Sequence, residues 1–90
     1  MKDVLAMMES VKAADAAWRA AEQAREGWAS QAVRAAYDLW IAPTAENYRA
    51  LVSVQAGYAH SAEVCGRARE VFYTVAGIEA AREAAAKLPR

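Results

Sequence analysis

The sequence is poor in the residues that break helices and in those that build catalytic sites. Its 90 residues include two prolines, four glycines, one cysteine and one histidine. A single cysteine, Cys65, excludes an internal disulfide, so nothing points to an oxidising compartment. The N-terminal apolar run is too short for a signal peptide, and no run approaches the roughly 20 residues of a membrane span. We therefore expect a cytoplasmic protein with no membrane contact.

The chain also lacks an excess of charge of either sign. Eleven basic and eleven acidic residues give a formal net charge of zero. Proteins that bind DNA or RNA gather basic residues to neutralise phosphates, and no such cluster occurs in this sequence. We therefore do not expect a nucleic acid partner.

Metal-binding and nucleophilic motifs are missing as well. His60 and Cys65 cannot complete a tetrahedral zinc site, and a spacing of five places them on different faces of a helix. Cys65 has no histidine positioned to activate it, and the four glycines form no phosphate-binding loop. The sequence therefore predicts that the protein is not an enzyme and holds no metal or cofactor.

What the chain does contain is alanine, which accounts for 25 residues. Alanine favours helix more than any other residue but contributes little burial. The few large apolar side chains must therefore be packed against small ones on neighbouring helices. We expect one all-α domain covering residues 1–90, with no strands.

Proline and capping signals divide this domain into two long helices, at about residues 3–41 and 45–87. Pro43 disfavours helix at the residue before it, and Thr44 is a suitable N-cap, with Glu46 in the following turn. Acidic residues four positions before basic ones predict three ion pairs on the helix surfaces. These pairs are Asp15–Arg19, Glu63–Arg67 and Glu83–Lys87.

Each predicted helix carries an apolar seam with the 3,4 spacing of a coiled coil. The first seam consists of Val4, Met7, Val11, Ala14, Trp18, Ala21, Arg25, Trp28, Ala32, Ala35, Leu39 and Ala42. The second consists of Leu51, Val54, Tyr58, Ser61, Cys65, Ala68, Phe72 and Val75, widened on one side by Gly57, Val64, Val71 and Ile78. Two such seams predict an antiparallel helical hairpin.

A hairpin that turns near Pro43 pairs residues whose numbers sum to about 86. This register places Trp18 opposite Ala68 and Trp28 opposite Tyr58. It also places Arg25, the only charge in the first seam, opposite Ser61. A lone cation in an apolar seam commonly fixes register or oligomeric state, and contact with an anionic ligand or partner is the alternative role for Arg25.

The lengths of the helices raise the question of what covers their outer faces. Thirty-nine helical residues span roughly 58 Å, whereas a compact domain of this size has a radius of gyration near 12 Å. Two hairpins that dimerise into a four-helix bundle resolve the difficulty. The alternative is a monomeric three- or four-helix bundle in which the helices break near Gly27 and Gly57.

A group of apolar residues near the turn lies outside both seams. Aromatic-rich groups of this kind are typical of protein interfaces, and a self-interface would use them equally well. The group consists of Val33, Tyr37, Trp40, Ile41, Tyr48 and Val52.

We therefore expect a non-catalytic protein–protein interaction module that uses this group to bind a partner. Its small size suggests a phage or mobile-element accessory protein that inhibits a host complex, in the manner of an anti-CRISPR. The alternative is a homo-oligomeric helical bundle that binds a small ligand between its helices. In that case Trp18, Trp28, Tyr58 and Arg25 would line the pocket.

Overall fold

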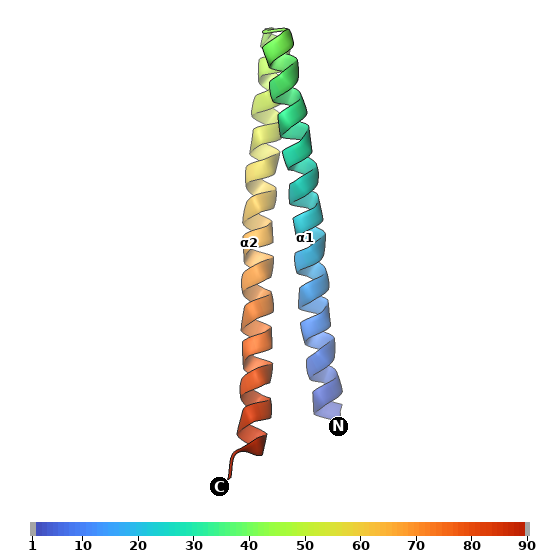
Figure 1. The fold of residues 1–90 in the computed structure, drawn as a ribbon, viewed down its shortest axis with the longest axis vertical. Coiled ribbons are helices and arrows are strands. Elements are labelled where there is room, and N and C mark those ends of the chain that lie inside the picture. Colours follow the sequence, from blue (N-terminus) through green and yellow to red (C-terminus); the bar gives the residue numbers. More distant parts are fainter. Residues whose placement is uncertain (1, 90) are drawn as a thin grey trace.

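The computed structural model describes the backbone of residues 2–89 and the side chains of residues 9–89. Two helices, α1 (Lys2–Ile41) and α2 (Ala45–Lys87), run antiparallel and are joined by a short turn (Figure 1). The molecule measures 70 × 19 × 13 Å, and its radius of gyration is 20.2 Å, well above the roughly 12 Å of a compact domain of this length. The all-α hairpin predicted from the sequence is confirmed.

Both helices are continuous through their glycines, so the prediction of a monomeric bundle broken near Gly27 and Gly57 is wrong. None of the four glycines has a positive φ, and each lies inside a regular helix. One glycine costs a helix only about 1 kcal/mol relative to alanine. The helix-forming residues on either side, together with the packing of the seams, outweigh that cost.

The turn is held by hydrogen bonds from both of its sides. Thr44 is the N-cap of α2, because its Oγ1 accepts a hydrogen bond from the backbone N–H of Asn47 at 3.1 Å. The side-chain amide of Asn47 in turn donates to the carbonyl oxygens of Ala42 at 2.9 Å and Asp38 at 3.4 Å. The same two carbonyls also accept backbone hydrogen bonds, from the N–H of Thr44 at 2.8 Å for Ala42 and from the N–H of Ala42 at 2.9 Å for Asp38. Asn47 therefore joins the end of one helix to the start of the next.

The predicted seams form the contact between the helices. In α1, all seam residues from Val11 to Leu39 are half-buried or buried, whereas Ala42 in the turn is exposed. The side chains of Val4 and Met7 lie outside the described residues. The α2 seam is likewise covered, except that Tyr58 remains 39% exposed. The three predicted ion pairs are present, at 3.0 Å for Asp15–Arg19, 2.9 Å for Glu63–Arg67 and 3.2 Å for Glu83–Lys87.

The side chains that meet across the seam differ in part from the predicted pairs. The indole of Trp28 lies over Gly57, not Tyr58, because only a residue without a Cβ leaves room for the ring. The ring of Trp18 contacts Phe72 and Tyr73, with centroids 5.3 and 5.8 Å away, about one turn beyond the predicted Ala68. Large aromatic rings therefore set the register of the hairpin.

The predicted widening of the α2 seam is also wrong beyond Gly57. Val64, Val71 and Ile78 are all exposed, whereas Ala62 and Ala76, on the other side of the seam, are half-buried. The contact between the helices is thus displaced away from the β-branched residues. This displacement follows from the aromatic cluster, in which Tyr73 lies over Trp18 on that other side.

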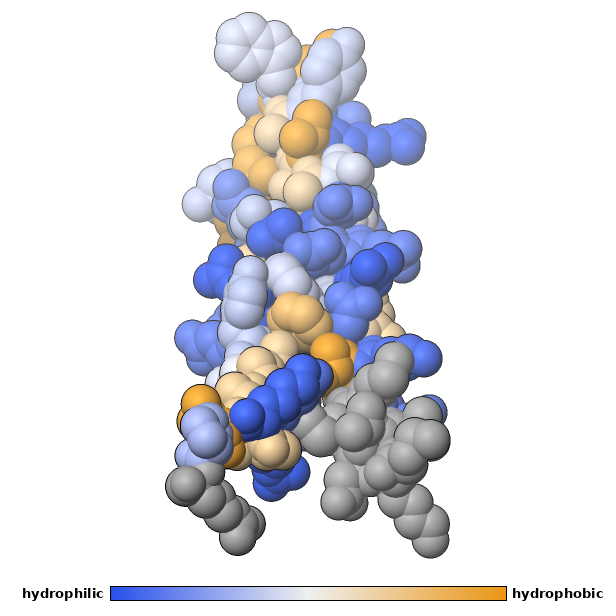
Figure 2. Space-filling view, turned by 60° about the horizontal axis from the view of Figure 1, so that its bottom comes forward, coloured by the Kyte–Doolittle hydropathy of each residue, from blue (hydrophilic) through white to orange (hydrophobic). Residues whose placement is uncertain are grey.

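The hairpin has almost no core. Among the residues whose side chains are described, only Ala14, Cys65 and Ser61 are buried, and no large side chain is fully enclosed. The accessible surface is 7136 Å², whereas a compact monomer of 9.7 kDa exposes about 5,100 Å². Figure 2 shows hydrophobic residues at the surface between charged ones. The protein therefore exposes about 2,000 Å² more than a compact monomer of its mass.

Candidate interaction surface

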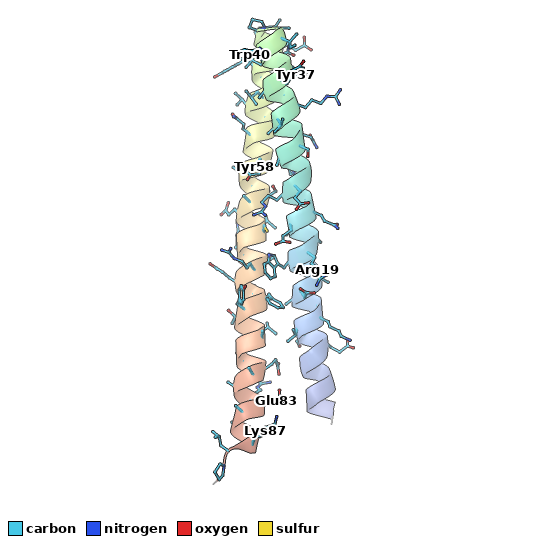
Figure 3. The ribbon with its side chains drawn as sticks, viewed as in Figure 1. Arg19, Tyr37, Trp40, Tyr58, Glu83 and Lys87 are labelled. Atoms are coloured by element: carbon cyan, nitrogen blue, oxygen red, sulfur yellow. The ribbon has the colours of Figure 1, made fainter. Side chains whose placement is uncertain are left out.

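The apolar group predicted near the turn lies at the surface, and we call these six residues the tip cluster. Trp40 is 85% exposed, which is unusual for a side chain with so much apolar area. Figure 3 shows Trp40 and Tyr37 at the turn end of the hairpin. The exposed side chains of the cluster are Val33, Tyr37, Trp40, Ile41, Tyr48 and Val52.

Helical geometry makes the α1 part of the tip cluster continuous. Tyr37 follows Val33 by four residues and precedes Ile41 by four, so the three share one side of α1. Trp40 is three residues from Tyr37 and extends the same surface toward α2. No charged side chain is placed between these four residues, although Arg34 and Asp38 lie beside them.

The α2 part of the cluster lies across the turn from Trp40. Tyr48 and Val52 are spaced four residues apart, lie to one side of the seam residue Leu51, and are both exposed. Arg49, which is exposed, lies beside Tyr48. An apolar centre bordered by a few charged residues is the usual composition of a protein interface.

Arg25 and Ser61 both lie in the contact between the helices. Arg25 is half-buried and Ser61 is 7% exposed. The Ser61 hydroxyl donates to the carbonyl oxygen of Tyr58 in its own helix at 3.0 Å. No hydrogen bond joins Ser61 to Arg25 among the described residues. The role of Arg25 in fixing register, or in contacting a ligand, stays a prediction.

The residues that could carry chemistry are scattered. Cys65 is 4% exposed, whereas His60 is exposed on the outer face of α2. Within the described part of the chain, no three His, Cys, Asp or Glu residues are grouped so as to hold a metal ion. Glu79 is an acidic residue whose partial burial the sequence did not predict. It continues the α2 seam, and its Oε2 is buried without a hydrogen-bond partner among the described residues.

A second apolar surface lies away from the turn. The heptad pattern of the sequence did not distinguish its residues from those of the seam. This surface is the row of Val64, Val71 and Ile78 on α2, each 41–55% exposed. Their seven-residue spacing places them in one line along the helix. The signal was present in the sequence, but only the structure shows that α1 leaves this line uncovered.

Comparison of the chain with protein-family models, curated proteins and solved structures gives no match. Within the described residues, neither helix is long and apolar enough to cross a membrane.

Proposed function

We propose that this protein is a non-catalytic interaction module that binds another protein through its tip cluster. The observation that carries the proposal is the exposure of six large apolar side chains around one turn, with Trp40 the most exposed of them. Tryptophan and tyrosine are the residues that most often dominate binding energy at protein interfaces. A hairpin 70 Å long presents this cluster at one of its ends.

The chemistry of the cluster indicates what kind of partner it fits. Its aliphatic residues require an apolar groove or pocket. The indole N–H of Trp40 and the hydroxyls of Tyr37 and Tyr48 require hydrogen-bond acceptors near the rim of that groove. Arg34, Asp38 and Arg49 border the cluster with charges of both signs, which favours a protein surface of mixed charge over a polyanion.

The second function considered from the sequence, a small ligand bound between the helices, has less support. Trp28 packs over Gly57, and Trp18 packs against Phe72 and Tyr73. These aromatic residues are thus engaged in holding the helices together. Ligand binding stays a prediction. The inhibitory role in a phage or mobile element also stays a prediction, because it rests on the size of the chain and not on any of its residues.

The test is affinity capture from the native host with the wild-type chain and with Trp40→Ala. We expect Trp40→Ala to weaken binding of the captured partner by at least about 30-fold, since truncating a dominant interface tryptophan costs roughly 2 kcal/mol or more. Circular dichroism should show unchanged helicity, because the side chain is exposed. Leu88→Ala is the matched control, because Leu88 is 67% exposed at the opposite end of the hairpin.

Two outcomes would contradict the proposal. One is equal capture of all partners by the wild type and Trp40→Ala. The other is a loss of helicity in Trp40→Ala, which would assign Trp40 to the fold.

A further inference from the structure

We propose that a second copy of this chain covers the side of the hairpin that carries Val64, Val71 and Ile78. The two copies lie side by side in the same direction, with their tip clusters at one end. This pairing goes beyond the proposed function, because it uses a different surface and assigns that surface a different partner.

The two sides of the contact between α1 and α2 are not alike. On one side, Asp15, Glu22 and Ala29 of α1 are half-buried, as are Ala62 and Ala76 of α2. We call this side the closed edge; the ring of Tyr73 lies over it.

The other side is open. Its α1 residues Ala17 and Ala24 are exposed, as are Val64, Val71 and Ile78 of α2. We call these five residues the open edge. In an antiparallel pair of helices, heptad positions g face one another across one side of the seam, and these five residues all occupy that position.

The five residues of the open edge are all apolar, whereas the closed edge includes two carboxylates. On the α2 side the open edge is bordered by His60, Arg67 and Thr74, and the Arg67 guanidinium is paired with Glu63 at 2.9 Å. On the α1 side it is bordered by Ala13, Ala20 and Gly27, all exposed and small. The apolar centre and polar border resemble a protein interface, and the small residues allow close approach of another helix.

The area of the molecule supports a partner of this size and shape. Each chain exposes about 2,000 Å² more than a compact monomer of its mass. If each of two copies buries about half of that excess and leaves the tip cluster exposed, about 2,000 Å² is removed from water in total, which is enough for a stable interface.

The arrangement of large and small residues fixes the direction of the pairing. The contacts of Trp28 with Gly57 and of Trp18 with Phe72 place Val64 near the level of Ala24, and Val71 near that of Ala17. If a two-fold axis parallel to the long axis of the hairpin relates the two copies, each residue lies at the same height along that axis in both copies. This symmetry therefore places the valines of each copy against the alanines of the other, large against small. The opposite direction would place alanine against alanine and leave voids.

The first test is the mass in solution, measured by light scattering during size-exclusion chromatography at tens of micromolar. We expect the wild type to have about twice the 9.7 kDa of one chain. Val71→Glu and Ala17→Glu should each reduce the mass to that of one chain, because they place a charge in a desolvated interface. Ala16→Glu is the matched control: Ala16 is also exposed but lies about 100° around α1 from Ala17.

A wild-type mass of one chain would overturn the proposal, and so would Ala16→Glu separating the copies while Ala17→Glu does not. Trp40→Ala should leave the mass unchanged. If Trp40→Ala alone separated the copies, the tip cluster would be the self-interface, and this result would remove the proposed function as well. The mass of the wild type and of Trp40→Ala therefore distinguishes failure of the pairing from failure of the proposed function.

The second test addresses variants that lose their fold together with their partner. Ala17→Glu and Val71→Lys are mixed, so that in the mixed pair the new carboxylate of one chain faces the new ammonium of the other. We expect the mixture to recover the two-chain mass and full helicity, while each variant alone does not. Failure to recover would overturn the parallel pairing, because the opposite direction does not bring residues 17 and 71 of different chains together.

Discussion

At the scale of single residues, the fold depends on how closely the side chains of one helix can approach the other helix. Gly57 is the clearest case, because a Cβ built on it would lie 2.5–2.7 Å from three ring atoms of Trp28. The other three glycines have open space at that position. Gly57 is thus required by tertiary contact, whereas Gly77 only lowers the stability of its helix.

Matched alanine substitutions test this difference. We expect Gly57→Ala to lower the free energy of unfolding by roughly 1–3 kcal/mol, because the indole of Trp28 must move from its packed position. Gly77→Ala should raise it by up to about 1 kcal/mol through helix propensity alone. Denaturant unfolding followed by circular dichroism, at one fixed protein concentration, measures both. A stabilising Gly57→Ala would show that Trp28 does not lie over Gly57.

At the scale of elements, the two helices are formed locally and are joined by a turn with its own hydrogen bonds. The Thr44 hydroxyl accepts from an N–H at the start of α2. The Asn47 amide adds a second donor to two carbonyls at the end of α1 that also accept backbone N–H groups. The ion pairs on the helix surfaces contribute much less, since each is exposed to water. The direction in which α2 leaves the turn is therefore set mainly by Thr44 and Asn47.

Removing the Asn47 side chain should weaken this connection. We expect Asn47→Ala to lower the free energy of unfolding by about 1 kcal/mol, because two carbonyl oxygens at the end of α1 lose a donor. Gln55→Ala is the control: Gln55 is exposed on the same helix and makes no hydrogen bond among the described residues. Equal effects of the two substitutions in denaturant unfolding would show that the Asn47 amide does not hold the turn.

At the scale of the whole molecule, the main feature is the surplus of exposed surface. Two helices of 40 and 43 residues can cover only one face of each other. A long rod with a thin core therefore leaves apolar residues on both of its sides and at its tip. The tip cluster and the open edge lie on different parts of that surface, so that binding at one leaves the other accessible.

Small-angle X-ray scattering tests the arrangement of the copies. Because side-by-side pairing keeps each residue at its own level, we expect the maximum dimension to stay near 70 Å while the scattering mass doubles. Pairing through the tips would extend the particle to nearly twice that length. A particle of that length would contradict pairing through the open edge.

The sequence by itself determined the helices, the turn and the residues of the seams. Alanine content and 3,4 spacing are local signals, and Pro43 with Thr44 marks the only boundary, so these predictions needed no tertiary information. The tip cluster was also predictable, because its residues fall outside both seams. The binding role assigned to it, and the role of Arg25, stay predictions.

Only the tertiary structure decided how the two seams fit together. The sequence could not show that Trp28 would lie over Gly57, or that Trp18 would reach Phe72 and Tyr73, because the direction of a large ring depends on the space opposite it. Trp28 covers the seam-widening row only at Gly57, and the contact of Trp18 with Tyr73 lies on the other side of the seam. These contacts leave Val64, Val71 and Ile78, which heptad spacing had assigned to the seam, exposed along their own side.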